Sequence, residues 1–69
     1  MERQSVSSSN LLSVGFEAGI LEIEFHDFAV YQYYDVPESI FDGLMNAESH
    51  GKYFDAKVKK AGFRYKRVH

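Results

Sequence analysis

Apolar and acidic side chains alternate without a break from Leu21 to Phe25, and this alternation constrains the fold more than any other feature of the chain. In an extended backbone Leu21, Ile23 and Phe25 lie on one face, whereas Glu22 and Glu24 lie on the other. A strand of this kind turns one face to a core and the other to water, which is typical of antiparallel sheets. We therefore expect the two glutamates to be solvated.

Two further strand patterns flank this segment at hairpin distance. Apolar residues alternate with small ones over 12–16, and β-forming residues fill 29–34. The turn at 17–19 ends in a glycine that can take a positive φ, and a second turn covers 26–28. These connections are too short for a crossover helix, so the strands form an antiparallel meander. The serine-rich stretch 5–10 is expected as an edge strand or a loop.

A helix is predicted to begin near Pro37, because proline suits a first helical turn. Asp35 and Glu38 have the spacing of a capping box. Gly43 weakens this helix by about 1 kcal/mol relative to alanine, and we expect it to allow a close approach to the sheet. The apolar residues at helical spacing, which would pack on the sheet, are Ile40, Phe41, Leu44 and Met45.

Ser49 is a good N-cap for a second short helix, which is expected to end near Lys60 before Gly62. The alternating residues 63–68 predict a last strand at the edge of the sheet. The predicted fold class is α+β: a three- to four-stranded antiparallel meander followed by two short helices on one face, with this C-terminal edge strand. The expected core is Leu12 or Val14, with Leu21, Ile23, Phe25, Ile40, Phe41, Leu44 and Phe54.

The length of 69 residues indicates a single domain over 1–69. The chain has no cysteine, which excludes a disulfide scaffold and a thiol nucleophile. Its three histidines, His26, His50 and His69, do not stand at metal-ligand spacing on one element, and no phosphate-binding loop is present. We therefore expect a cytoplasmic protein that is not an enzyme, with no cofactor, metal or membrane partner.

The charges are distributed unevenly along the chain. Residues 1–50 hold nine of the ten acidic residues and a single base, Arg3, whereas residues 51–69 hold seven of the eight bases. This C-terminal third either folds back and neutralises the acidic half or binds a polyanion. If the C-terminal third binds a polyanion, its residues form a basic strip in which the cations contact phosphates and the aromatic ring stacks on bases. The strip consists of Lys57, Lys59, Lys60, Arg64, Tyr65, Lys66 and Arg67.

The ordered residues resemble the KTSC domain, a family of small modules found at the C-terminus of some lysyl-tRNA synthetases and as free-standing bacterial or phage proteins. The resemblance covers about residues 6–59. The matching pieces are Val6-x-Ser8-x-x-Leu11, Val14-Gly15-Phe16, Leu21-x-Ile23-x-Phe25, Tyr31-Gln32-Tyr33-Tyr34-Asp35-Val36-Pro37 and Ala47-x-Ser49-x-Gly51-Lys52-Tyr53-Phe54.

Two positions depart from the pattern of that family. Phe16-Glu17 stands where members commonly have Tyr-Asp, and the stretch 27–29 replaces a usual glycine in the second turn. The resemblance implies no firm activity, although the synthetase context suggests RNA binding. We expect the motif residues to be structural: Tyr31 and Tyr33, which should face the helices, together with Asp35, Val36, Pro37, Ser49, Gly51, Tyr53 and Phe54.

Two functional interpretations follow. The first is a small protein–protein interaction or adaptor module that uses an exposed strand edge. The second is a weak RNA-binding accessory domain that uses the basic strip. Salt dependence separates them, because RNA binding through several phosphates weakens steeply with salt. The partner is therefore an unknown protein or an RNA.

Overall fold

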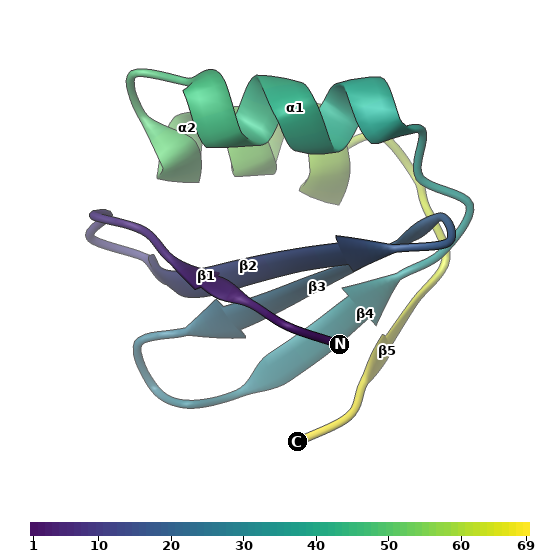
Figure 1. Cartoon of the computed structure of the whole chain (residues 1–69), viewed down its shortest axis with the longest axis horizontal. Coiled ribbons are helices and arrows are strands. Elements are labelled where there is room, and N and C mark those ends of the chain that lie inside the picture. Colours follow the sequence, from purple (N-terminus) through teal and green to yellow (C-terminus); the bar gives the residue numbers. More distant parts are fainter.

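A five-stranded antiparallel sheet forms one layer of the computed structural model, which describes residues 1–69, and helices form the other (Figure 1). The strands lie in the sheet in chain order. The predicted α+β class and the C-terminal edge strand are confirmed. The N-terminus adds a short edge strand, of which only Ser5 belongs to the serine-rich stretch 5–10. The strands are β1 (Gln4–Ser5), β2 (Leu11–Glu17), β3 (Ile20–Phe25), β4 (Val30–Tyr33) and β5 (Tyr65–Arg67).

Both helices lie on the same face of the sheet (Figure 1). Helix α1 spans Glu38–Asn46, and α2 spans His50–Phe54 and continues as a π-helix over Asp55–Lys59 (η1). The Ser49 hydroxyl accepts a hydrogen bond from the Lys52 backbone N–H at 3.2 Å, so the predicted N-cap is confirmed. Neither helix has the length and apolar character needed to cross a lipid bilayer.

The predicted capping box at the start of α1 is wrong. The N-cap is Pro37, and no side chain bonds to the free N–H groups there. Asp35 instead lies in the turn with φ 59°, and its carboxylate accepts a hydrogen bond from Arg64 at 3.2 Å. Gly43 also differs from the expectation, because its α-carbon lies against the Tyr53 ring of α2 and not against the sheet. The glycine therefore sets the spacing between the two helices.

The alternating strand β3 has the predicted register at the centre of the sheet. Ile23 is paired with Val14 on one side and Tyr31 on the other, and Leu21 is paired with Tyr33. These side chains face the helices, and Leu21 and Ile23 are fully buried. The fully buried Leu44 of α1 completes the core over them, and Phe25, Ile40 and Phe41 pack around its edge while remaining partly exposed.

A β-bulge in β2 changes which leucine enters the core. Leu11 is paired with Phe25 and Ser13 with Glu24, so Leu12 is the extra residue without an opposite partner. Leu11 is fully buried, whereas Leu12 is only half-buried. The expected alternation through Leu12 is therefore wrong at this end of the strand, although Val14 lies in the core as predicted.

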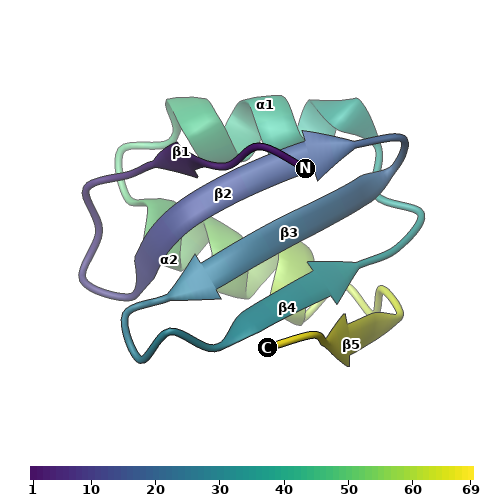
Figure 2. The ribbon, with the colours of Figure 1, turned by 60° about the horizontal axis from the view of Figure 1, so that its bottom comes forward.

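The face of the sheet opposite the helices is not simply solvated, which corrects the expectation for Glu22. Residues 1–5, here called the N-terminal strap, run along β2 (Figure 2). Arg3 of the strap donates hydrogen bonds to Glu22 at 2.5 Å and to Ser13 at 2.9 Å. Gln32 donates to the other Glu22 oxygen at 2.8 Å, and Ser13 donates to Glu24 at 2.8 Å. Glu22 retains an exposed fraction of only 7%.

These contacts lower the pKa of Glu22. Burial alone raises the pKa of this carboxyl, because removing water disfavours the charged form. The hydrogen bonds from Gln32 and Arg3, with the positive charges of Arg3 and the N-terminus, outweigh that effect. The net pKa lies below the usual 4.5. Arg3 and the N-terminus of the strap thus supply the positive charge that balances the acidic face of the sheet.

The strap can lie this close because position 15 has no side chain. A β-carbon on Gly15 would stand 2.6 Å from the Glu2 carbonyl oxygen and 3.0 Å from the Arg3 side chain. The obstacle at Glu2 is backbone, which cannot rotate away as the end of a side chain can. Gly15 is therefore the position that admits the strap.

The hairpin between β2 and β3 carries an unfavourable residue. Ala18 has φ 51° and Gly19 has φ 80°, the pair of positive values that defines a type I′ turn. An alanine in this conformation costs roughly 1 kcal/mol, whereas asparagine tolerates it. We expect Ala18→Asn to raise the free energy of unfolding by about 1 kcal/mol and Ala18→Val to lower it, as measured by urea denaturation. Equal stability of the two variants would contradict this turn geometry.

Candidate functional site

A groove of about 530 Å³ opens beside β5, on the face of the sheet that carries the helices. The helices leave part of this face open, so the half-buried Tyr31 of β4 and the exposed Tyr65 of β5 remain accessible beside η1. We call this feature the β5 groove. Its lining residues are Phe25, Asp27, Ala29, Tyr31, Tyr33, Phe54, Lys59, Tyr65 and Arg67.

Three tyrosines form one wall because they share a face of neighbouring strands. Tyr33 is paired with Tyr65, and Tyr31 is paired with Arg67. The ring centroids of Tyr31 and Tyr33 are 6.5 Å apart, and the Tyr65 ring lies 6.0 Å from the first and 5.7 Å from the second. Phe54 of α2 meets Tyr33 edge-on at 5.6 Å. The result is a continuous aromatic surface of the kind that receives flat or apolar groups.

The tyrosines differ in how far they reach the surface. Tyr33 is buried, whereas Tyr65 keeps 64% of its surface exposed. Burial, with the neighbouring hydroxyls of Tyr31 and Tyr65, raises the pKa of Tyr33 to about 12. The Tyr33 phenol is therefore neutral at physiological pH and contributes a hydroxyl, not a charge, to the groove. The prediction that Tyr31 and Tyr33 face the helices is confirmed, but Tyr31 is half-buried and lines the groove.

Two cations stand on the groove lining. Lys59 comes from η1 and Arg67 from β5, and neither forms an ion pair within the chain. The Arg67 guanidinium donates one hydrogen bond, to the His69 carbonyl oxygen at 3.0 Å. Asp27 is the single carboxylate of the lining. A negatively charged group that follows the aromatic surface would meet more positive than negative charge.

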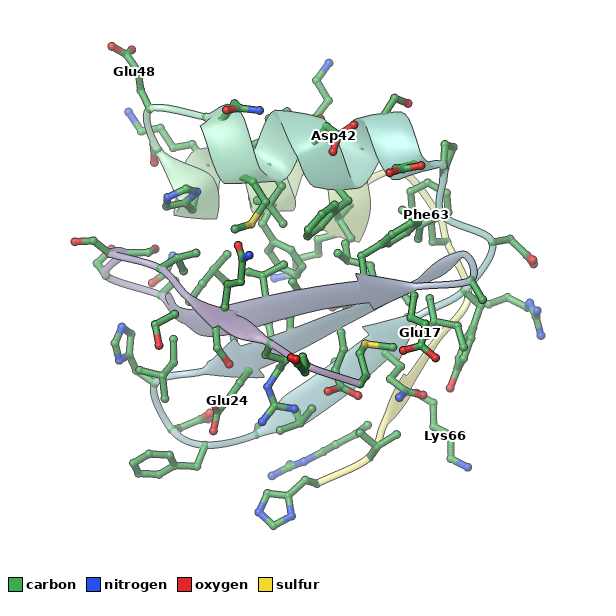
Figure 3. All side chains as sticks on the ribbon, in the orientation of Figure 1. Glu17, Glu24, Asp42, Glu48, Phe63 and Lys66 are labelled. Atoms are coloured by element: carbon green, nitrogen blue, oxygen red, sulfur yellow. The ribbon has the colours of Figure 1, made fainter.

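The structure divides the basic strip between different surfaces. Tyr65 joins Lys59 and Arg67 in the groove, but Lys66 is paired with Gln32 on the opposite face of the sheet, the face that carries Glu24 (Figure 3). Alternation along β5 causes this division, because successive side chains point to opposite faces. The role of the strip in binding stays a prediction.

The other members of the strip are engaged elsewhere or stand alone. Lys60 pairs with Asp55 at 3.1 Å. Arg64 pairs with Asp35 at 3.2 Å and lies over the Tyr34 ring at 5.6 Å from its centroid. Lys57 is exposed and has no ion pair. The Arg64–Asp35 pair is the one ion pair that joins the C-terminal third to the acidic half.

A shallower polar hollow of about 390 Å³ adjoins the groove and shares Phe25, Asp27, Phe54 and Lys59 with it. His26 lines this hollow, and its ring makes a 2.7 Å hydrogen bond with the Ser8 carbonyl oxygen. His50, in contrast, bonds the Leu44 carbonyl oxygen at 2.8 Å. Both rings therefore hold loops and helix ends in place.

Several of the motif residues contact more than one element of the fold. Val36 is buried, and its N–H bonds the Gly19 carbonyl oxygen at 2.9 Å, which ties the start of α1 to the first hairpin. Gly51 lies against Asn10, where a β-carbon would stand 3.1 Å from the amide nitrogen. Tyr53 packs against Gly43. Phe54 serves both the core and the groove.

Sequence reasoning did not identify the groove as a site. Tyr31 and Tyr33 are expected there as structural residues that face the helices, and Tyr65 as part of the basic strip, so the three rings are not placed together. The alternation of side chains along the two strands could have placed the rings together. Once β5 is paired beside β4, Tyr65 lies on the same face of the sheet as Tyr33. The strap had a signal too, since Arg3 is the only base among the first fifty residues.

Several known proteins are similar to this chain in sequence or in structure. A protein of Stutzerimonas stutzeri described as uncharacterised is 39% identical over 99% of both chains. A protein of Tsukamurella paurometabola is 40% identical over 81% of this chain and 87% of its own. The crystal structure of a KTSC domain protein from Yersinia pestis superposes with a TM-score of 0.91 at 38% identity, over 99% of this chain and 97% of the other. The family model of the KTSC domain matches residues 7–65, and the chain therefore belongs to the KTSC domain family.

Proposed function

We propose that this protein is a non-catalytic binding module whose β5 groove receives a segment of another cytoplasmic protein. One observation carries the proposal: an aromatic groove of about 530 Å³ opens beside the last strand of the sheet. Its volume falls within the range of ligand sites, and exposed aromatic residues with a neighbouring arginine are typical of interaction hot spots. Catalysis is not part of the proposal, because the His26 and His50 rings bond backbone carbonyls and neither lines this groove.

The experiment selects binders from a random peptide library displayed on phage and then compares two variants. Tyr65→Ala removes the most exposed ring of the groove. Phe28→Ala is the matched control, because Phe28 is exposed to the same 64% and lies outside the groove. We expect selected peptides to bind Tyr65→Ala about tenfold more weakly than the wild type, and Phe28→Ala equally well.

A selection that enriches no peptide would overturn the proposal. The same holds if enriched peptides bind the Tyr65→Ala protein as tightly as the wild type, because the groove would then not be their site. Circular dichroism of each variant checks that weaker binding does not result from unfolding of the variant.

A second function, binding of single-stranded RNA, is favoured by the position of Tyr65 on the same groove as Lys59 and Arg67. A ring with cations nearby can stack on a base while the cations contact phosphates. If RNA is the ligand, its affinity should fall with salt, by a slope of roughly 0.7 for each phosphate contact. A fluorescent uridine oligonucleotide titrated at two salt concentrations tests this alternative.

A further inference from the structure

We propose that the partner segment binds as an additional strand on the free edge of β5, and that this segment is acidic. The inference rests on the proposed function and specifies both its geometry and its ligand chemistry. It starts from β5, which is the last strand of the sheet and has a neighbour on one side only.

The outer edge of β5 carries unpaired backbone groups. Toward β4, the Arg64 carbonyl oxygen accepts from the Tyr34 N–H at 2.9 Å, and the Val68 N–H donates to the Val30 carbonyl oxygen at 2.8 Å. In an antiparallel pair, alternate residues of a strand bond the same neighbour. The backbone N–H and C=O groups of Tyr65 and Arg67 therefore point away from β4, toward solvent. They can pair with an incoming strand.

The edge and the groove belong to one surface. Tyr65 and Arg67 offer their backbone groups to the edge, while their side chains line the groove. Side chains of an added strand that lie opposite these two residues would point to the same face of the sheet. Such a strand therefore gains main-chain hydrogen bonds and places alternate side chains on the aromatic surface, which is how extended peptides are recognised at sheet edges.

The charges near the edge of β5 favour an acidic partner segment. Lys66 and Arg67 stand on the edge strand, and Lys59 faces it from η1; none of them has an ion pair within the chain. Basic residues on an edge repel a second copy of the same edge, so β5 is protected from pairing with another β5. The same charges attract an acidic segment. An acidic extended peptide is thus the partner that this edge accepts.

The test uses a defined probe: an acetylated, fluorescein-labelled decapeptide in which glutamates alternate with valine and phenylalanine. Its counterpart carries lysine in place of every glutamate. By fluorescence polarisation, we expect the glutamate peptide to bind and the lysine peptide to bind at least roughly tenfold more weakly. The charge-reversed protein Lys59→Glu/Arg67→Glu should bind the glutamate peptide roughly tenfold more weakly than Lys52→Glu/Lys57→Glu, a control of equal net charge.

Two measurements address strand addition itself. Peptides N-methylated at odd or at even positions lose alternate N–H donors, so one of the two should fail to bind while the other binds normally. Hydrogen exchange followed by NMR should slow at the Tyr65 and Arg67 amides about tenfold on binding, with no change at Lys66.

The outcomes separate this inference from the proposed function. If library peptides bind through Tyr65 but both N-methylated probes bind equally and exchange at Tyr65 is unchanged, strand addition is wrong and the binding groove remains. If only lysine-rich peptides bind, the acidic partner is wrong. If the uridine oligonucleotide binds and neither decapeptide does, the inference is overturned in favour of nucleic acid.

Discussion

Replacing Leu11 with alanine is expected to lower the free energy of unfolding by about 3 kcal/mol, whereas Leu12→Ala should lower it by about 1 kcal/mol. The two residues are chemically identical neighbours, but the β-bulge places only Leu11 fully in the core. Truncation of a buried leucine loses the burial of its methyl groups and leaves a cavity that the surroundings fill only in part. The pair of variants therefore tests the bulge directly.

The loss at Leu11 is large for a chain of 69 residues, whose total stability is roughly 3 to 10 kcal/mol. Urea denaturation followed by circular dichroism gives both values, provided that the m-values of the variants agree. Equal losses, or a larger loss at Leu12, would show that β2 alternates without the bulge and that Leu12 enters the core.

Replacing Arg3 with methionine is expected to destabilise the protein by about 1 to 3 kcal/mol at pH 7 and by much less at pH 3. The substitution removes the cation that bonds both Ser13 and the nearly buried Glu22. Glu22 then keeps Gln32 as its one side-chain partner, while its charge remains out of water.

The pH dependence follows from the lowered pKa of Glu22. A carboxyl with a folded-state pKa below its usual 4.5 stabilises the protein above that value, and the contribution is lost as the pH falls through the folded-state pKa. At pH 3 a larger fraction of the Glu22 carboxyl is protonated than at pH 7. The substitution of Arg3 therefore lowers the free energy of unfolding by less at pH 3. Chemical denaturation at both pH values measures the difference.

Arg64→Met is the matched control for this experiment. Arg64 also forms an ion pair with a carboxylate, that of Asp35, but both of these side chains are largely exposed. Surface pairs of this kind contribute little, so the control should stay within about 0.5 kcal/mol of the wild type at both pH values. Similar effects of the two substitutions at pH 7 would mean that the strap does not stabilise the sheet.

The strands were predictable where the alternation is strict. From Leu21 to Phe25 each apolar residue has an acidic neighbour, and a shift of one residue would expose the whole apolar set. The same reasoning failed at Leu11 and Leu12, because two adjacent leucines fit either face. Which of the two leucines is buried depends on how β2 pairs with β3. The sequence of β2 alone does not determine this pairing.

The groove was less predictable than the fold. Its wall requires β5 to pair beside β4, and its opening requires the helices to leave part of that face of the sheet open. Charge counting found the bases of the C-terminal third but not their directions. Alternation places Arg67 in the groove and Lys66 on the other face, so neighbouring charges serve different surfaces. The role of Glu22 was missed because the strap covers it from a distant part of the chain.

The order of the strands has a consequence for how the chain folds. Because β1 to β4 pair with their neighbours in sequence, each of these ladders closes over a short connection and costs little loop entropy. The ladder between β4 and β5 is different, since it must close over the whole helical segment. We expect β5 to join the sheet last during folding and to detach first during unfolding. Partial opening would then disrupt the groove while leaving the four-stranded core intact.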